Sequence, residues 1–141
     1  MTERDVRKMI AERAGSQIFM QPIESPGTAL GIPDLYLRTV FHSYWTELKI
    51  VSVGGRLLSK PYVAVPFRPG QRSWLRRYYL HYAGRSLLIA GWKDDEWMVS
   101  VFLNDGIREI YSRMEFDMLP VYRASYATFS PVHFLRAVGD H

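Results

Sequence analysis

The first hydrophobic pattern in the chain has the spacing of an amphipathic helix. Apolar residues recur at three- and four-residue intervals and fall on one side of a helix over residues 2–14: Val6, Met9, Ile10 and Ala14. Thr2 can cap this helix, with Asp5 at the third helical position as the return partner of a capping box. Gly15 then ends it.

Alternating apolar and polar positions then predict strands. The stretch SQIFMQPIES alternates enough for a strand that Pro22 breaks, and SPGTALG reads as a loop. PDLYLRTV and SYWTELKIVSV follow as two successive strands, which we expect to form an antiparallel pair. The double glycine at 54–55 ends the second of them.

The second half of the chain starts with another helix, RPGQRSWLRRYYLHYAG, with Pro69 at its first position and Gly84 as its stop. RSLLIAGW and EWMVSVFL are strands joined by a turn at KDD, whereas DGIREIYSRM is short and ambiguous. SPVHFLRAV predicts a small closing helix, with Ser130 as cap and Pro131 at its first position. The order of elements predicts a mixed α/β (α+β) domain around a small sheet.

Composition bounds the class of protein. A chain of 141 residues with 48% hydrophobic residues is expected to fold as one domain, 1–141. It has no cysteine, which excludes disulfides, cysteine zinc sites and thiol nucleophiles. It shows no apolar run of about 18 residues and no signal peptide, so we expect a soluble, cytoplasmic protein.

The net charge is +4 and arginine supplies most of the positive charge. The guanidinium fork suits phosphate, so this balance hints at a polyanionic partner such as a nucleic acid. Ordinary solubility is the alternative explanation of the same charge.

Three charged residues stand inside the two central strands. Because side chains alternate along a strand, Glu47 and Lys49 share one face of SYWTELKI, while Leu48 faces the other way. If Asp34 pairs opposite Glu47, all three charged groups meet on one face. An ionised group buried without a partner costs several kcal/mol, so this convergence needs a cause.

A divalent cation is one such cause. Two facing carboxylates repel, and a hard ion such as Mg²⁺ between Asp34 and Glu47 removes the repulsion. Lys49, one pleat further on, would then reach the attacking water or the phosphate, which is the chemistry of phosphodiester hydrolysis. The alternative is an aspartate at a turn and an exposed Glu–Lys pair, with no metal.

These residues resemble a known superfamily. Pro33-Asp34 followed by Glu47-Leu48-Lys49 is similar to the motif of the PD-(D/E)xK nucleases. Gly31, the downstream PGQRSW with Gln71, and the strand GRSLLIAGW resemble the VRR-NUC branch, which is itself similar to archaeal Holliday-junction resolvases. The resemblance covers about residues 2 to 92, and residues 98–141 form a C-terminal extension whose role it does not define.

The resemblance implies a restriction-endonuclease-like core, with helix, three strands, helix and strands around a small mixed sheet. It implies that Asp34, Glu47 and the Leu48 carbonyl hold one or two Mg²⁺ ions, for which Mn²⁺ is expected to substitute. Lys49 would orient or activate water, and Gln71 would assist from the second helix.

The family pattern also adds an acid on the first helix. At about 100° per residue, Glu3 falls on the buried side of that helix, whereas Glu12 falls away from it. We therefore expect Glu3 to join the metal site, with Glu12 as the second candidate. Favourable interaction of Glu3 with the helix dipole is the alternative.

Three arginines repeat every four residues in the second predicted helix. Arg68, Arg72 and Arg76 would form one stripe, which either tracks a phosphate backbone or is a solvated face. Arg38, on the Asp34 face, is a further possible phosphate contact. Tyr78 and Tyr82 share another side with Leu75 and are expected to face the core.

The remaining polar clusters and the tryptophans predict no catalytic or metal-binding role. Asp94 to Glu96 reads as a turn, and the four histidines lack metal-ligand spacing. Trp45, Trp74, Trp92 and Trp97 are expected in the core or at an interface, with Trp45 as the exception because it shares the Glu47 face.

Together these features predict a Mg²⁺-dependent endonuclease acting on double-stranded or branched DNA. By its resemblance to resolvases we expect a homodimer, and by its resemblance to small stand-alone nucleases a phage origin, with the host cytoplasm as its location. The alternatives are a non-catalytic nucleic-acid-binding module on the same fold, and a structural domain in which the triad is a coincidence.

Overall fold

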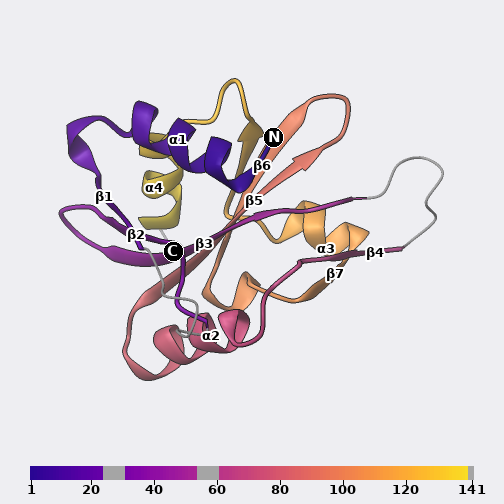
Figure 1. The fold of residues 1–141 in the computed structure, drawn as a ribbon, viewed down its shortest axis with the longest axis horizontal. Helices are drawn as coiled ribbons and strands as arrows, with labels where there is room; N and C mark the ends of the chain where they lie inside the picture. Colours follow the sequence, from indigo (N-terminus) through magenta and orange to yellow (C-terminus); the bar gives the residue numbers. More distant parts are fainter. Residues whose placement is uncertain (24–30, 54–60, 140–141) are drawn as a thin grey trace.

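The computed structural model of the chain describes residues 1–23, 31–53 and 61–139. The double glycine at 54–55 and most of the predicted SPGTALG loop lie outside these residues. The elements follow in the order α1 (Glu3–Ala14), η1 (Gly15–Gln17), β1 (Phe19–Pro22), β2 (Leu35–Arg38), β3 (Ser43–Ile50), β4 (Tyr62–Ala64), α2 (Gln71–His81), β5 (Arg85–Lys93), β6 (Trp97–Leu103), η2 (Asn104–Gly106), β7 (Ile110–Ser112), α3 (Arg113–Met118), β8 (Tyr122–Ser125) and α4 (Pro131–Gly139) (Figure 1).

The first helix forms as its sequence predicts. The Thr2 side chain accepts a hydrogen bond from the Asp5 backbone N–H, and the Asp5 carboxylate accepts one from the Thr2 N–H, which completes the capping box. The four apolar residues of the helical stripe are buried, and Gly15 caps the other end with a φ of 65°. The helix therefore presents one fixed face to the sheet.

A mixed six-stranded sheet is the centre of the fold. Its strand order is β1-β2-β3-β5-β6-β8, and only the β3–β5 pair among these neighbours is parallel. The connection between β3 and β5 carries α2, as a parallel pair requires a crossover. A second sheet pairs β4 with β7.

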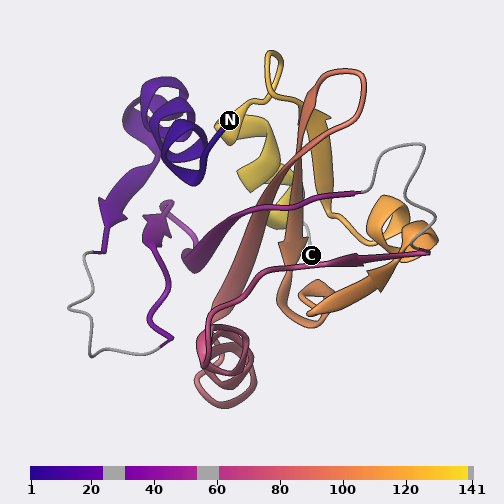
Figure 2. The same ribbon diagram turned by 45° about the vertical axis from the view of Figure 1, so that its right-hand side comes forward.

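Helices cover both faces of the main sheet. Alternate residues of β5 separate the two layers, with Leu87 and Ile89 in one apolar cluster and Leu88 and Ala90 in the other. The first cluster contains the buried faces of α1 and α4, and the second contains residues of α2, α3 and the small sheet. In Figure 2, α1 and α4 lie together and apart from α2 and α3.

The end of the chain belongs to the same core. β8 pairs antiparallel with β6 at the sheet edge, and Phe134 and Val138 of α4 are buried in the cluster that contains α1. Ser130 caps α4 by accepting from the His133 N–H, and Pro131 is its first residue, as predicted. The ambiguous segment 105–114 contains β7 and the start of α3.

The predicted bounds of the second helix were wrong at both ends. Pro69 lies in a turn before the helix, because Gly70, with a φ of 86°, is the N-cap and α2 starts at Gln71. The helix ends at His81, and Ala83 takes the left-handed conformation that was expected of Gly84. Gly84 is required for another reason, since the Tyr78 ring occupies the space that a Cβ there would need.

No helix in the described part of the chain is both long enough and apolar enough to cross a membrane.

Candidate active site

The pairing of β2 with β3 brings the two predicted acids together. Leu35 pairs with Thr46, so the same register places Asp34, just before β2, opposite Glu47. The Leu48 N–H donates a hydrogen bond of 3.2 Å to Asp34 Oδ2, which holds the aspartate at the point where β2 begins. The convergence predicted for this face is therefore present in the structure.

Glu47 is the most enclosed charged residue of the site. It is 1% exposed, and its Oε1 accepts a hydrogen bond of 2.8 Å from Gln71 Nε2 at the first position of α2. Gln71 is fixed in turn, because its Oε1 accepts from the Arg68 backbone N–H at 2.7 Å. The other oxygen, Glu47 Oε2, is buried without a hydrogen-bond partner among the described residues.

Burial and charge together change the acidity of Glu47. Removal from water raises its pKa most, a carboxyl–carboxyl hydrogen bond with Asp34 and the Asp34 charge raise it further, and Lys49 opposes them, which leaves a pKa of about 9. Without a cation, Glu47 therefore keeps its proton at neutral pH. A buried acid that receives no hydrogen bond at one oxygen and lies against a second acid has the features of a site prepared for a positive charge.

Lys49 lies between two carboxylates. Its Nζ is 3.6 Å from Glu47 Oε1 and 3.9 Å from Glu3 Oε1, and the residue is only 5% exposed. Glu3 projects from the first turn of α1, and burial raises its pKa although Lys49 lowers it. The amine thus links the acid of α1 to the acid of β3.

Of the two helix acids, only Glu3 lies in this group. Glu12 pairs with Lys8 at 4.0 Å on the exposed side of α1, where both side chains are mostly in solvent. The helical-angle argument explains this outcome, since residue 12 is turned away from the buried stripe.

A small pocket opens at this point of the sheet. Its volume is about 190 Å³, and it is lined by Glu3, Arg4, Arg7, Ile23, Asp34 and Leu48. Sequence reasoning did not select the two arginines. Arg7 had a detectable signal, because it lies one helical turn after Glu3 and therefore shares its side of α1.

Asp34 and Glu47 are the candidates to hold a cation. In the described residues no group of three or more His, Cys, Asp or Glu side chains is arranged to hold a metal. Mg²⁺, however, needs only one or two carboxylates with water and phosphate oxygens. The orphaned Glu47 Oε2 and the adjacent Asp34 fit that requirement. Leu48, whose carbonyl was the third predicted ligand, also lines the pocket.

The predicted arginine stripe is divided. Arg68 precedes α2, so helical spacing does not apply to it, and its charge acts on Glu3. Arg72 and Arg76 lie on another side, where their charges act on Tyr79, which donates a hydrogen bond of 2.9 Å to Asp105. Arg38 is exposed at the far end of β2. Of the four arginines predicted to contact phosphate, only Arg68 therefore lies near the acids.

Two glycines fit the loop before Asp34 against α2. Gly31 has a φ of 87°, and a Cβ placed there would be 2.5 Å from the Gly70 carbonyl oxygen. The backbone before Asp34 thus touches the N-terminus of the helix that carries Gln71. This contact aligns the two segments that meet at Glu47.

Other predicted features fall outside the site. Asp94 to Glu96 form an exposed turn, with the Asp94 N–H bonded to the Glu96 carbonyl. Leu75 faces the core and Tyr78 is half-buried, but Tyr82 is 71% exposed, so its predicted core position was wrong. Tyr82 caps the helix and lies beyond its last turn.

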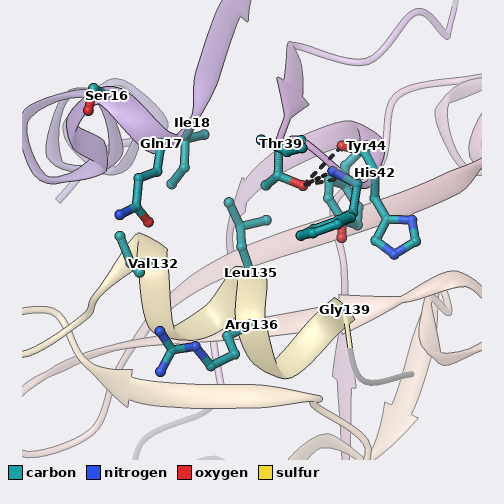
Figure 3. Close-up of a pocket in the computed structure, with 12 residues that line it drawn as sticks. Ser16, Gln17, Ile18, Thr39, His42, Tyr44, Val132, Leu135, Arg136 and Gly139 are labelled. Carbon is teal, nitrogen blue, oxygen red and sulfur yellow. Dashed lines mark hydrogen bonds between the residues drawn. The ribbon is translucent and has the colours of Figure 1, made fainter.

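A larger cavity, of about 810 Å³, lies elsewhere (Figure 3). It lies between the residues after α1, the turn from β2 to β3, and α4, with Leu135 and Arg136 on the α4 side. None of the four predicted catalytic residues lines it.

Comparison with known proteins gives a fold. No family model and no curated protein sequence matches the chain. Among solved structures, the chain is similar to Hjc of Archaeoglobus fulgidus, a Holliday junction resolvase from an archaeal hyperthermophile. The TM-score is 0.56 at 9% sequence identity, and the match covers 82% of this chain and 89% of that one. The chain therefore has the restriction-endonuclease-like fold of a resolvase, as its motif predicted.

Proposed function

We propose that this protein is a Mg²⁺-dependent endonuclease that hydrolyses phosphodiester bonds in double-stranded or branched DNA. The observation that carries the proposal is the meeting of Asp34, just before β2, with Glu47 and Lys49 of β3, where the buried Glu47 Oε2 receives no hydrogen bond from a described N–H or O–H donor. The PD-(D/E)xK motif of the chain and its resolvase fold support it.

The chemistry divides among these residues. Asp34, Glu47 and the Leu48 carbonyl would hold Mg²⁺, which when bound neutralises charge on the phosphoryl group and acidifies the attacking water. Gln71 holds Oε1 of Glu47, so that Oε2 stays directed away from the helix for a cation. Lys49, kept between two acids, orients the water or stabilises the charge that develops on the phosphate.

Recognition of the substrate is assigned to the arginines around the pocket. Arg4 and Arg7 line it beside Glu3, and Arg68 lies close enough for its charge to act on Glu3. Guanidinium groups bind phosphate oxygens through two parallel hydrogen bonds, so this ring suits the backbone on either side of a cleaved bond.

The test is cleavage of supercoiled, linear, single-stranded and four-way-junction DNA, with Mg²⁺ and with chelator. Cleavage that needs Mg²⁺ and is lost in Asp34→Ala and Lys49→Ala is the expected result, with Lys8→Ala as a charge-matched control on the exposed side of α1. Binding without cleavage, unchanged by both substitutions, would instead identify a non-catalytic nucleic-acid-binding module.

Resolving a four-way junction into two duplexes needs a cut in each of two strands, and a homodimer supplies two active sites for these cuts. We include this assembly in the proposal because of the resolvase resemblance. Sedimentation of the protein alone and with junction DNA tests it, and a monomer in both conditions would reject it.

A further inference from the structure

Six aromatic side chains form a continuous row from β1 across β2 and β3 to the end of α2. Successive ring centroids are 5.2 to 6.5 Å apart, within the range of aromatic contact. We call this row the aromatic strip: Phe19, Tyr36, Trp45, Trp74, Tyr78 and Tyr82. Its members come from four elements, so the row is a product of the fold and not of one amphipathic helix.

The strip is a surface feature. Phe19 at one end is 57% exposed and Tyr82 at the other is 71% exposed. The four rings between them are half-buried, and of these only Trp74 packs against a core cluster. Packing of the interior therefore does not account for the whole row.

The strip adjoins the candidate active site. Trp45 precedes Glu47 by two residues and shares its face of β3, so their Cα atoms are about 7 Å apart. Trp74 follows Gln71 by one helical turn, and its ring lies 5.3 Å from that of Trp45. A polymer held at the carboxylates therefore reaches these rings within about two nucleotides.

The sequence segments that carry five of the six rings contain arginines and no acids. The chain has no Asp or Glu from Leu35 to Thr46 or from Pro61 to Lys93. Arg38 follows Tyr36 by two residues on β2, Arg77 precedes Tyr78 on α2, and both are exposed. Half-exposed aromatic rings flanked by arginines are typical of surfaces that hold single-stranded nucleic acid, by base stacking and by phosphate contacts.

We propose that the aromatic strip binds unpaired nucleotides of the DNA substrate next to the candidate active site. The bases stack on the exposed ring faces, and Arg38 and Arg77 contact the phosphates. The inference rests on the proposed function for the identity of the polymer, and it narrows the substrate class to DNA that passes from duplex to single strand beside the cleaved bond, such as a flap or a splayed arm.

The experiment measures fluorescence anisotropy of a labelled oligonucleotide of about 12 nucleotides, single-stranded or as a blunt duplex, in chelator. Tyr82→Ala and Phe19→Ala are chosen because their side chains are exposed and their loss spares the core. Each is expected to weaken single-strand binding about five-fold or more, since one base stack is worth about 1 kcal/mol or more. Blunt-duplex binding should stay within about two-fold of wild type.

Two matched controls separate stacking from loss of surface area. Phe41→Ala removes an aromatic ring that is 84% exposed and is not part of the strip, and it should leave single-strand binding unchanged. Tyr82→Phe keeps the ring and should bind as the wild type does. Tryptophan fluorescence gives a second readout, because Trp74→Phe should reduce the quenching by single-stranded DNA whereas Trp97→Phe should not.

Unchanged single-strand binding in both alanine variants would overturn the inference, as would an equal loss on blunt duplex. A wild-type dimer that Tyr82→Ala converts to a monomer, without a change in single-strand binding, would show that the strip is covered by a second copy instead. Because binding is measured without Mg²⁺, the two proposals fail separately. Strip-dependent binding without cleavage rejects the nuclease alone, and cleavage with unaffected strip variants rejects the strip alone.

Discussion

Gln71 Nε2 donates a hydrogen bond of 2.8 Å to Glu47 Oε1, which ties the first residue of α2 to the middle of β3. The bond is buried, and it decides which oxygen of the glutamate remains available. The geometry of the candidate site therefore depends on a helix that contributes no charge of its own at this point.

Replacing Gln71 with alanine removes the side-chain amide that donates to Glu47 Oε1. We expect a loss of about 1–3 kcal/mol in the free energy of unfolding, because a buried acceptor loses its donor. Chemical denaturation in chelator measures this. Gln17→Ala, on an exposed residue after α1, should change stability by less than about 0.5 kcal/mol. Equal effects of the two substitutions would contradict the role given to this bond.

The stability of the metal-free protein should fall as pH rises. The pKa of Glu47 is raised from an ordinary 4.5 to about 9 in the folded state, so the folded chain binds a proton that the unfolded chain releases. The resulting stabilisation is complete below pH 4.5 and is lost as pH approaches 9, by at most about 1.4 kcal/mol per pH unit. Thermal unfolding in chelator from pH 5 to 9 should show this slope.

Glu47→Gln serves as the control for that slope, since it keeps the shape of the side chain and cannot ionise. Its unfolding temperature should depend less on pH than that of the wild type. Mg²⁺ should stabilise the wild type more at pH 9 than at pH 6, because a carboxylate must lose its proton to bind a cation. A wild type and a variant with the same pH dependence would refute the buried proton.

Glu3 and Glu12 form a matched pair on one helix. Glu3→Gln removes the charge that lies 3.9 Å from Lys49 Nζ, so we expect cleavage to slow about 10-fold or more. Glu12→Gln removes a charge in solvent that pairs only with Lys8, and its rate should match the wild type. Single-turnover cleavage of the best DNA substrate measures both. A larger effect at Glu12 would reassign the acid of α1.

Gly31 is required by both its conformation and its surroundings. Gly31→Ala would place a Cβ 2.5 Å from the Gly70 carbonyl oxygen at a φ of 87°, so we expect a loss of at least about 2 kcal/mol. Gly15 has a φ of 65° and a ψ of −160° but nothing within 4 Å of its Cβ position, so Gly15→Ala should lose about 1–3 kcal/mol from backbone strain alone, less than Gly31→Ala. Denaturation of the two variants separates the close contact from the backbone strain.

Arg7 and Lys8 are neighbouring cations on different sides of α1. Arg7 lines the small pocket, and Arg7→Ala should weaken DNA binding and reduce the slope of log affinity against log salt by about 0.9. Lys8 pairs with Glu12, and Lys8→Ala should leave that slope unchanged. Titrations at several salt concentrations, in chelator, give both slopes. Equal slopes for the two variants would remove Arg7 from the phosphate contacts.

The strand pairing at the site could be predicted because it depends on local alternation. Leu35, Leu37 and Leu48 fall on one face by their period of two, and that face is the one buried against α1 and α4. Because β2 and β3 pair antiparallel in the register that places Asp34 opposite Glu47, the two carboxyl groups lie close together. Glu3 could be placed for the same kind of reason, from the period of a helix.

The parts that could not be predicted depend on contacts between segments distant in sequence. The hydrophobic spacing does not show that α2 starts only at Gln71. Arg68 therefore lies before the helix and is separated from Arg72. Nothing local shows that β8 and α4 would complete the core around α1. The aromatic strip is likewise invisible in sequence, since its six rings come from four elements.

The contact of α1 with the last third of the chain sets an order of assembly. Arg13 Nη1 donates to the Tyr126 and Phe129 carbonyls at 2.6 and 3.0 Å, and the Tyr126 hydroxyl donates to the Asp5 carbonyl. A ribosome releases that anchoring segment long after it has made Glu3. Glu3 is therefore made long before the segment that fastens its helix, and a nascent chain keeps the α1 acid apart from the rest of the candidate site until residues 126–129 have emerged.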